Sequence, residues 1–113
     1  MDVIVIGEIL IDFIPGTEEA SYIRNPGGGP ANAAVAMAKN GLSVGMYCKM
    51  GNDDFGRFLS KTMTGYGVKL LSPELTDEAV TTMAYVTLYP DGERSFTFSR
   101  KPGADMLLSR DEL

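Results

Sequence analysis

A cluster of three glycines, residues 27–29, is the sharpest chemical signal in the sequence. Consecutive glycines let a ligand approach main-chain N–H groups, and here they stand where a helix is predicted to begin. Asn32 follows in the first helical turn, and its amide can both donate and accept hydrogen bonds. The combination suits a neutral polyol better than an anion, although a flexible connector before a helix explains the same glycines.

The glycine cluster matches neither common nucleotide motif. A Walker loop requires Gly-Lys followed by Ser or Thr, whereas Pro30 and Ala31 follow these glycines. The dinucleotide fingerprint lies directly after the first strand of its domain and requires its third glycine where Asn32 stands. We therefore set both nucleotide interpretations aside.

Asp12 is the second candidate, because it interrupts an otherwise apolar run from Ile9 to Ile14. Ligands of α/β sheets gather at the carboxyl ends of strands, where a carboxylate can accept hydrogen bonds from sugar hydroxyls. An outward-facing residue at a strand end is the alternative. Asp53 and Asp54 fit an N-cap and a first helical turn, so we predict structural roles for both.

Residue types exclude several kinds of chemistry within this chain. It has one cysteine and no histidine, which rules out an intrachain disulfide, a histidine-ligated zinc site and a Ser-His-Asp triad. Cys48 ends an apolar stretch and has no activating partner, so we predict that it is buried and not a nucleophile.

The composition is that of one globular domain without a signal for nucleic acid or membrane binding. The 113 residues are 44% hydrophobic, and a net charge of −5 opposes binding to phosphate backbones or anionic lipid. No apolar run reaches the roughly 20 residues that span a bilayer, and the first residues lack the basic start of a signal peptide. We expect a cytoplasmic protein.

Strand and helix signals alternate along the first part of the chain. The β-branched run at 3–6, which Gly7 ends, predicts a buried strand, and residues 9–14 extend its apolar character. Residues 15–30 predict loops or a short exposed hairpin. The later predicted elements are a helix at 30–40, a strand at 43–49, a helix from 53 to about 63 and a short strand at 68–71. This order indicates the α/β class with parallel crossovers.

A predicted hairpin interrupts this alternation. Two strand-like runs, 81–89 and 94–100, are joined by residues 90–93, Pro-Asp-Gly-Glu, which are typical of a turn with positive φ at the glycine. Phe96 and Phe98 fall on one face of the second strand. A two-stranded ribbon is marginal in water, so we expect it to cover something.

Together these motifs resemble the N-terminal signature of ribokinase-like, PfkB-type sugar kinases, and among them most of all fructokinases. The resemblance rests on the glycine cluster with its helix, on the second glycine cluster at 51–56, and on the strand that starts at Thr81. The Pro-Asp-Gly-Glu hairpin and the segment 100–105 follow in the family's order. The resemblance implies a three-layer α/β sandwich, of which this chain holds the N-terminal part of the central sheet with flanking helices, and a small β lid.

The resemblance also implies sugar-binding residues. Asp12, Gly28, Gly29 and Asn32 occupy positions that contact the sugar in this family. We add Arg100 as a substrate-binding residue, because its guanidinium leaves an acidic substrate possible. No metal ligand is implied within this chain.

The lid implied by the resemblance comprises segments at about 13–25 and 82–100, with Phe96 and Phe98 on the second segment. In the family this lid often makes the contact between two subunits. We therefore expect a homodimer that is formed through the lid.

The family's catalytic base and ATP site have no counterpart in residues 1–113. Family members are much longer, and their base is an Asp in a Gly-Ala-Gly-Asp motif of the C-terminal half. Asp105 follows Gly103-Ala104 but lacks the second glycine, so we do not assign it as the base. We expect the sugar-binding N-terminal part of a kinase that uses ATP and Mg²⁺, with neither group bound and no activity in this chain alone. The alternatives are a standalone non-catalytic sugar-binding or dimerisation module, and a kinase for ribose, a nucleoside or 2-keto-3-deoxygluconate.

Overall fold

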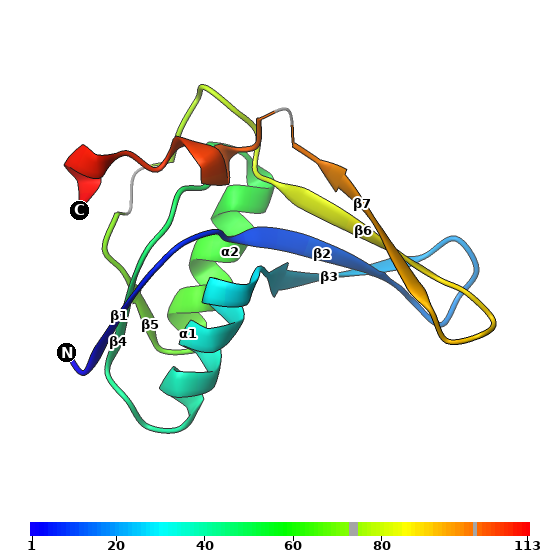
Figure 1. The fold of residues 1–113 in the computed structure, drawn as a ribbon, viewed down its shortest axis with the longest axis horizontal. Helices are drawn as coiled ribbons and strands as arrows, with labels where there is room; N and C mark the ends of the chain where they lie inside the picture. Colours follow the sequence, from blue (N-terminus) through cyan, green and yellow to red (C-terminus); the bar gives the residue numbers. More distant parts are fainter. Residues whose placement is uncertain (73–74, 101) are drawn as a thin grey trace.

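The structure is a computed structural model that describes residues 1–72, 75–100 and 102–113. Its first sheet has three parallel strands in the order β1-β4-β5, at the left of Figure 1. The strands are β1 (Val3–Ile6), β4 (Val44–Tyr47) and β5 (Val68–Leu70). This sheet and the two helices beside it form the body of the molecule.

Both helices pack on one face of this sheet. α1 (Gly29–Lys39) has Pro30 in its first turn, where a proline costs no hydrogen bond, and α2 (Asp54–Gly65) is capped by Asp53. The buried side chains that join helices and strands are Ala31, Ala34, Val44, Met46, Leu59, Met63 and Val68. The predicted helices and the parallel strands are confirmed. No helix of the described residues has the length and apolar character needed to cross a bilayer.

The strand predicted from the β-branched run at 3–6 is confirmed as β1, but the prediction that this strand is buried is wrong for one of its faces. β1 ends at Ile6, and the chain then enters a second sheet with β2 (Leu10–Pro15). On the face of the first sheet away from the helices, Ile4 and Ile6 are each 55% exposed. A run of β-branched residues favours a strand, but which layer covers that strand depends on segments remote in the sequence.

The second sheet has four strands in the order β3-β2-β6-β7 and projects from the body (Figure 1). β2 is joined by β3 (Tyr22–Gly27), β6 (Met83–Leu88) and β7 (Arg94–Ser99). β2 and β6 pair in parallel, and β3 and β7 are the antiparallel outer strands. We call this sheet the β arm. The short exposed hairpin predicted within residues 15–30 is confirmed as the turn from β2 into β3.

Aromatic side chains attach the base of the β arm to the body. The Phe13 ring stacks on Tyr85 with 5.0 Å between ring centroids and meets Tyr22 edge-on at 6.4 Å. Phe13 also packs edge-on against Phe55 of α2, at 5.7 Å. Each such pair contributes about 0.5–1.5 kcal/mol beyond the area that it buries. The arm is therefore held at Phe13, while its far end extends into solvent.

The predicted hairpin of β6 and β7 is confirmed. Gly92 has a φ of 87°, and its N–H donates to the Tyr89 carbonyl at 3.0 Å. Glycine adopts this positive φ without strain, which allows the tight turn. After β7, the chain forms two short 3-10 helices, at Ala104–Leu107 and Arg110–Glu112.

Candidate functional site

Asp12 lies within the β arm, on β2, with Asn25 of β3 on one side and Ala84 of β6 on the other. Its carboxylate rests against Gly27, where an added Cβ atom would collide with Asp12 Oδ2. A larger residue at position 27 would displace the carboxylate, so Gly27 is what brings Asp12 next to the start of α1. Asp12 and the glycine cluster, predicted separately, thus lie together.

The glycine cluster exposes main-chain groups beside Asp12. Gly28 is the N-cap of α1 with a φ of 95°, and a Cβ atom there would lie 3.1 Å from the Glu8 carbonyl oxygen. The positive φ and the crowding both require glycine. Gly29 faces open space, and Asn32 is exposed one turn later, with its N–H donating to the Gly28 carbonyl at 2.9 Å.

Glu8 belongs to the same site, although the sequence prediction missed it. Its Cγ lies 3.3 Å from the point that a Cβ atom would occupy if residue 28 were not glycine. Its Oε2 lies 3.6 Å from Nη1 of Arg100. Burial first, and the negative charge of Glu8 second, raise the pKa of Asp12. The signal that could have found Glu8 is its place just after the first strand, where ligands of α/β sheets bind.

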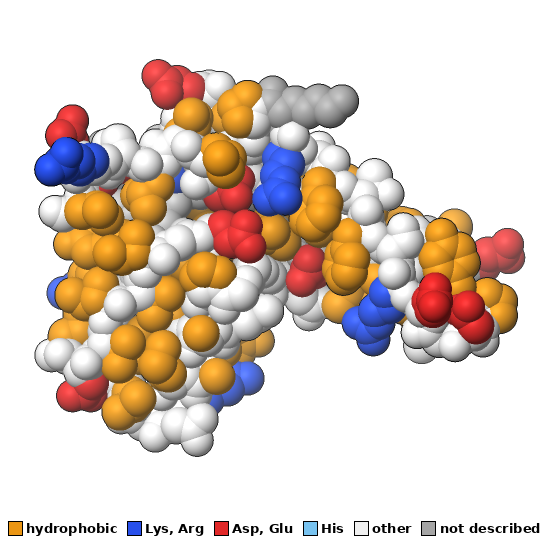
Figure 2. All heavy atoms as spheres, in the orientation of Figure 1, with side chains coloured by type: hydrophobic (Ala, Val, Ile, Leu, Met, Phe, Trp, Pro, Cys, Tyr) orange, Lys and Arg blue, Asp and Glu red, His pale blue; other side chains and the backbone are white. Residues whose placement is uncertain are grey.

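Arg100, which follows β7, brings a positive charge to the Glu8 carboxylate. Its guanidinium carbon lies 4.3 Å from the centroid of the Phe98 ring, a cation–π distance. Phe96 and Phe98 stack at 6.2 Å and are 51% and 45% exposed. A hollow of about 410 Å³ opens here, lined by Val80, Phe98, Ser99, Arg100 and Pro102. Figure 2 shows a basic side chain between acidic ones in this central part of the surface, with hydrophobic side chains along the arm.

The site combines acceptors and donors at close range. The carboxylates of Asp12 and Glu8 accept hydrogen bonds, whereas Arg100, the Asn32 amide and main-chain N–H groups donate them. The described residues make no hydrogen bond to the Asp12 carboxylate, so its acceptor positions are left for a ligand. Two neighbouring carboxylates would repel phosphate groups, so the site suits a neutral polyhydroxylated ligand better than a nucleotide.

Asp53 and Cys48 have the structural roles predicted for them. The Asp53 carboxylate accepts hydrogen bonds from the Gly56 N–H at 2.7 Å and from the Thr81 N–H and hydroxyl at 2.9 and 2.7 Å. Burial alone would raise the pKa of Asp53, but these hydrogen bonds outweigh burial and hold the pKa below its usual range. Burial raises the pKa of the Cys48 thiol to about 11, so it stays protonated at neutral pH.

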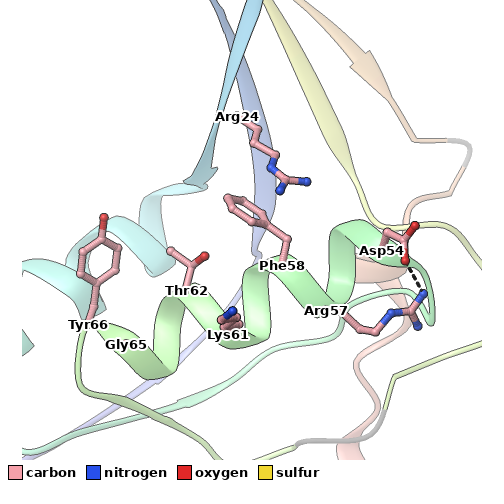
Figure 3. A pocket seen from close by; sticks show the side chains of 8 residues that line it. All are labelled: Arg24, Asp54, Arg57, Phe58, Lys61, Thr62, Gly65 and Tyr66. Atoms are coloured by element: carbon pink, nitrogen blue, oxygen red, sulfur yellow. Dashed lines mark hydrogen bonds and ion pairs between the residues drawn. The ribbon is translucent and has the colours of Figure 1, made fainter.

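A groove of about 790 Å³ lies elsewhere, between the outer face of α2 and β3 (Figure 3). It is lined by Arg24, Asp54, Arg57, Phe58, Lys61, Thr62, Gly65 and Tyr66. Arg24 reaches over the Phe58 ring at 4.2 Å, and Asp54 pairs with Arg57 at 2.8 Å. None of the predicted sugar contacts lines this groove, and its one carboxylate is already paired. We therefore place the candidate site at Asp12 in spite of the greater volume here.

Known proteins share both the sequence and the shape of this chain. Residues 1–112 match the pfkB family of carbohydrate kinases. The chain is 42% identical to fructokinase-1 of Zea mays, over 98% of its own length and 36% of the maize protein. It thus spans about a third of the length of this relative.

Solved structures extend the similarity to the fold. A fructokinase from Vibrio cholerae with fructose, ADP and calcium bound has a TM-score of 0.88 and 37% identity, covering 98% of this chain and 36% of that one. An aminoimidazole riboside kinase from Salmonella enterica, complexed with aminoimidazole riboside and an ATP analogue, has a TM-score of 0.84 and 32% identity. The match covers 98% of this chain and 34% of that one. The predicted α/β class and ribokinase-like architecture are confirmed. Because the family match includes nearly every residue, the chain belongs to the pfkB family of carbohydrate kinases.

Proposed function

We propose that this chain is the sugar-binding part of an ATP-dependent fructokinase, which transfers a phosphoryl group from ATP to a hydroxyl of fructose. The observation that carries this proposal is the Asp12 carboxylate, which lies beside the glycine cluster and receives no hydrogen bond from the described residues. The fructokinase from Vibrio cholerae with fructose bound matches 98% of this chain, which supports fructose as the sugar.

Each site residue has a distinct role in this proposal. Asp12 accepts hydrogen bonds from two sugar hydroxyls, and the main chain at Gly28 and Gly29 lets the sugar approach the start of α1. The Asn32 amide donates to one hydroxyl and accepts from another. Arg100 donates from the side of the β arm, so the sugar is held between arm and body.

The β arm acts as a lid in this proposal, through segments at about 13–25 and 82–100. It contacts α2 through Phe13 and Arg24, and its Phe96 and Phe98 rings are exposed beside Arg100. Closure over the sugar would exclude water from the reacting hydroxyl. Hydrogen exchange at residues 82–100 should slow when fructose and nucleotide saturate the complete protein, and unchanged exchange would contradict a moving lid.

We also propose a homodimer formed through the same lid. Several large apolar side chains on the β arm are exposed: Tyr22, Ile23, Leu88, Tyr89, Phe96 and Phe98. Burying these side chains against a second copy would be favourable, because exposed apolar patches of this kind mark association surfaces. Sedimentation of the complete protein tests this directly, and a monomer at micromolar concentration would contradict it.

We propose that ATP and Mg²⁺ bind outside residues 1–113, in the cytoplasmic complete protein. ATP supplies the phosphoryl group, and Mg²⁺ neutralises charge on the phosphate chain. The glycine cluster is a poor phosphate site, because the Glu8 side chain lies against Gly28 and the Asp12 carboxylate against Gly27. The described residues include no group of three or more His, Cys, Asp or Glu side chains that could hold a metal ion. In this proposal the chain's own residues bind and orient the sugar.

Fructose-dependent release of ADP by the complete protein tests the proposed activity. We expect ADP release with fructose and none from this chain alone, since we propose that the base and the ATP site lie outside residues 1–113. Faster turnover of aminoimidazole riboside would favour a riboside kinase, the second candidate that the Salmonella enterica structure supports. Fructose binding without any ADP release from the complete protein would instead favour a non-catalytic sugar-binding module.

A further inference from the structure

Asp105 is the one carboxylate among the described residues that the fold buries. It lies in the first 3-10 helix after the β arm, and its side chain is 1% exposed. The hydroxyl of Thr82, itself buried just before β6, donates a hydrogen bond to Asp105 Oδ1. A buried carboxylate costs free energy unless it is paired and hydrogen-bonded, so its second oxygen also requires a partner.

The second oxygen of Asp105 faces Arg100. Oδ2 lies 4.0 Å from Arg100 Nη1, and the same nitrogen lies 3.6 Å from Glu8 Oε2. A carboxylate of the body and a carboxylate from the segment after the arm therefore share one guanidinium nitrogen. The Arg100 side chain is only 34% exposed, so water and salt screen these charges less than on an open surface.

The backbone around Asp105 is built to keep this arrangement. A Cβ atom at Gly103 would collide with the Thr82 hydroxyl oxygen and lie 3.0 Å from Asp105 Oδ1, so only glycine lets the segment approach. The carbonyl of Thr82 accepts a hydrogen bond from the Ile11 N–H at 3.0 Å. Thr82 thereby ties Asp105 to the strand residue that precedes Asp12.

We propose that Asp105 is a positioning residue that holds Arg100, together with Glu8, facing the sugar site. Asp105 cannot touch the sugar itself, because it is buried and Thr82 and Arg100 face its two oxygens. It is the negative charge of Asp105, and not only its shape, that orients the guanidinium. This inference rests on the proposed function for the role of Arg100 as a sugar contact.

Kinetics of the complete protein provide the first test. Asp105→Asn keeps the size of the side chain and an acceptor for Thr82 but removes the charge, so KM for fructose should rise about tenfold while kcat changes less than about twofold. Asp54→Asn, which removes an exposed carboxylate from the pair with Arg57, is the matched control and should leave KM unchanged. Because Asp105 acts through Arg100, the double variant with Arg100→Gln should be no worse than Arg100→Gln alone. An unchanged KM in Asp105→Asn beside a raised KM in Arg100→Gln would overturn the proposal.

A nuclear magnetic resonance experiment on the complete protein provides a test that does not depend on activity. The Nε–H signal of Arg100, assigned by its loss in Arg100→Gln, should shift and exchange faster with water in Asp105→Asn but not in Asp54→Asn. Thr82→Val should lower the melting temperature and leave this signal in place, because the charge of Asp105 remains. If the complete protein phosphorylates no sugar, the proposed function fails, and the Arg100 signal still decides whether Asp105 holds the guanidinium. A signal unmoved by Asp105→Asn would show that it does not.

Discussion

Two half-buried aspartates of this molecule have opposite surroundings. Asp53, at the start of α2, accepts three hydrogen bonds from Gly56 and Thr81, and these hold its pKa below the usual range although burial alone would raise it. Asp12, on β2, accepts none from the described residues, and burial together with the charge of Glu8 raises its pKa. The fold satisfies one carboxylate and leaves the other without donors.

This difference separates a structural carboxylate from one that is open to a ligand. A half-buried charge without partners costs folding free energy, and proteins accept that cost mainly at sites where a ligand supplies the partners. The glycines beside the two aspartates differ in the same way. A Cβ atom at Gly56 would collide with the Gly51 carbonyl oxygen, so the second glycine cluster is closed by its own backbone. At the first cluster, Gly29 faces open space.

The largest effect is expected from Asp12→Ala in the complete protein. Each charged hydrogen bond that is lost costs about 1.5–3 kcal/mol, so the affinity for fructose should fall about tenfold or more. Calorimetric titration measures this change, and the affinity for ATP without sugar should stay the same. Wild-type fructose affinity in this variant would break the comparison, because Asp12 would then be a second structural carboxylate.

Asp53→Ala tests the other half of the comparison. Loss of the helix cap should lower the free energy of unfolding by about 0.5–2 kcal/mol and leave fructose affinity unchanged. Urea denaturation of the complete protein measures the first quantity, and calorimetric titration of the complete protein measures the second. If fructose binding disappeared while the free energy of unfolding stayed intact, the sugar site would have to move from Asp12 to α2.

Asn32→Ala sharpens the comparison with a neutral side chain. The loss in fructose binding should be about 0.5–1.5 kcal/mol per hydrogen bond, because a water molecule can take the place of the amide. The matched control is Asn40→Ala at the other end of α1, where the Asn40 amide donates to the Ala36 carbonyl at 2.7 Å. The control should change stability and not fructose affinity. Equal fructose affinities in both variants would remove Asn32 from the site.

The smallest effects are expected in the pH dependence of stability, where the two aspartates should have opposite signs. The lowered pKa of Asp53 means that its stabilisation is present at neutral pH and is lost as the pH falls through that pKa, so the deficit of Asp53→Asn should vanish in strong acid. Because the pKa of Asp12 is raised in the folded protein, the free energy of unfolding falls as the pH rises from the ordinary pKa of an aspartate to the raised pKa of Asp12. Asp12→Asn should therefore be more stable than wild type at about pH 7 and lose that gain by about pH 3. Urea denaturation across this pH range measures the change in stability of both variants. A loss of stability in Asp12→Asn at neutral pH would contradict the gain that we predict.

Several features of the fold could be predicted from the sequence, because neighbouring residues determine them. The cap of α2 depends on Asp53 and the Gly56 N–H three residues later, and the hairpin turn depends on the positive φ of Gly92. α1 likewise begins where glycines give way to Pro30 and a run of alanines. Such preferences involve one turn of chain, so residue type and spacing are enough.

By itself, the sequence determined where the two helices, the strand at 3–6 and the β6–β7 hairpin lie, and it nominated residues around the glycine cluster as candidates for sugar binding. Only the tertiary structure decided that the apolar run at 3–14 divides between two sheets, that Glu8 lies beside Arg100, and that Asp105 is buried under Thr82. These contacts join segments far apart in the chain. They follow from the parallel pairing of β2 with β6, and the register of such remote strands depends on packing between whole elements and not on any local pattern.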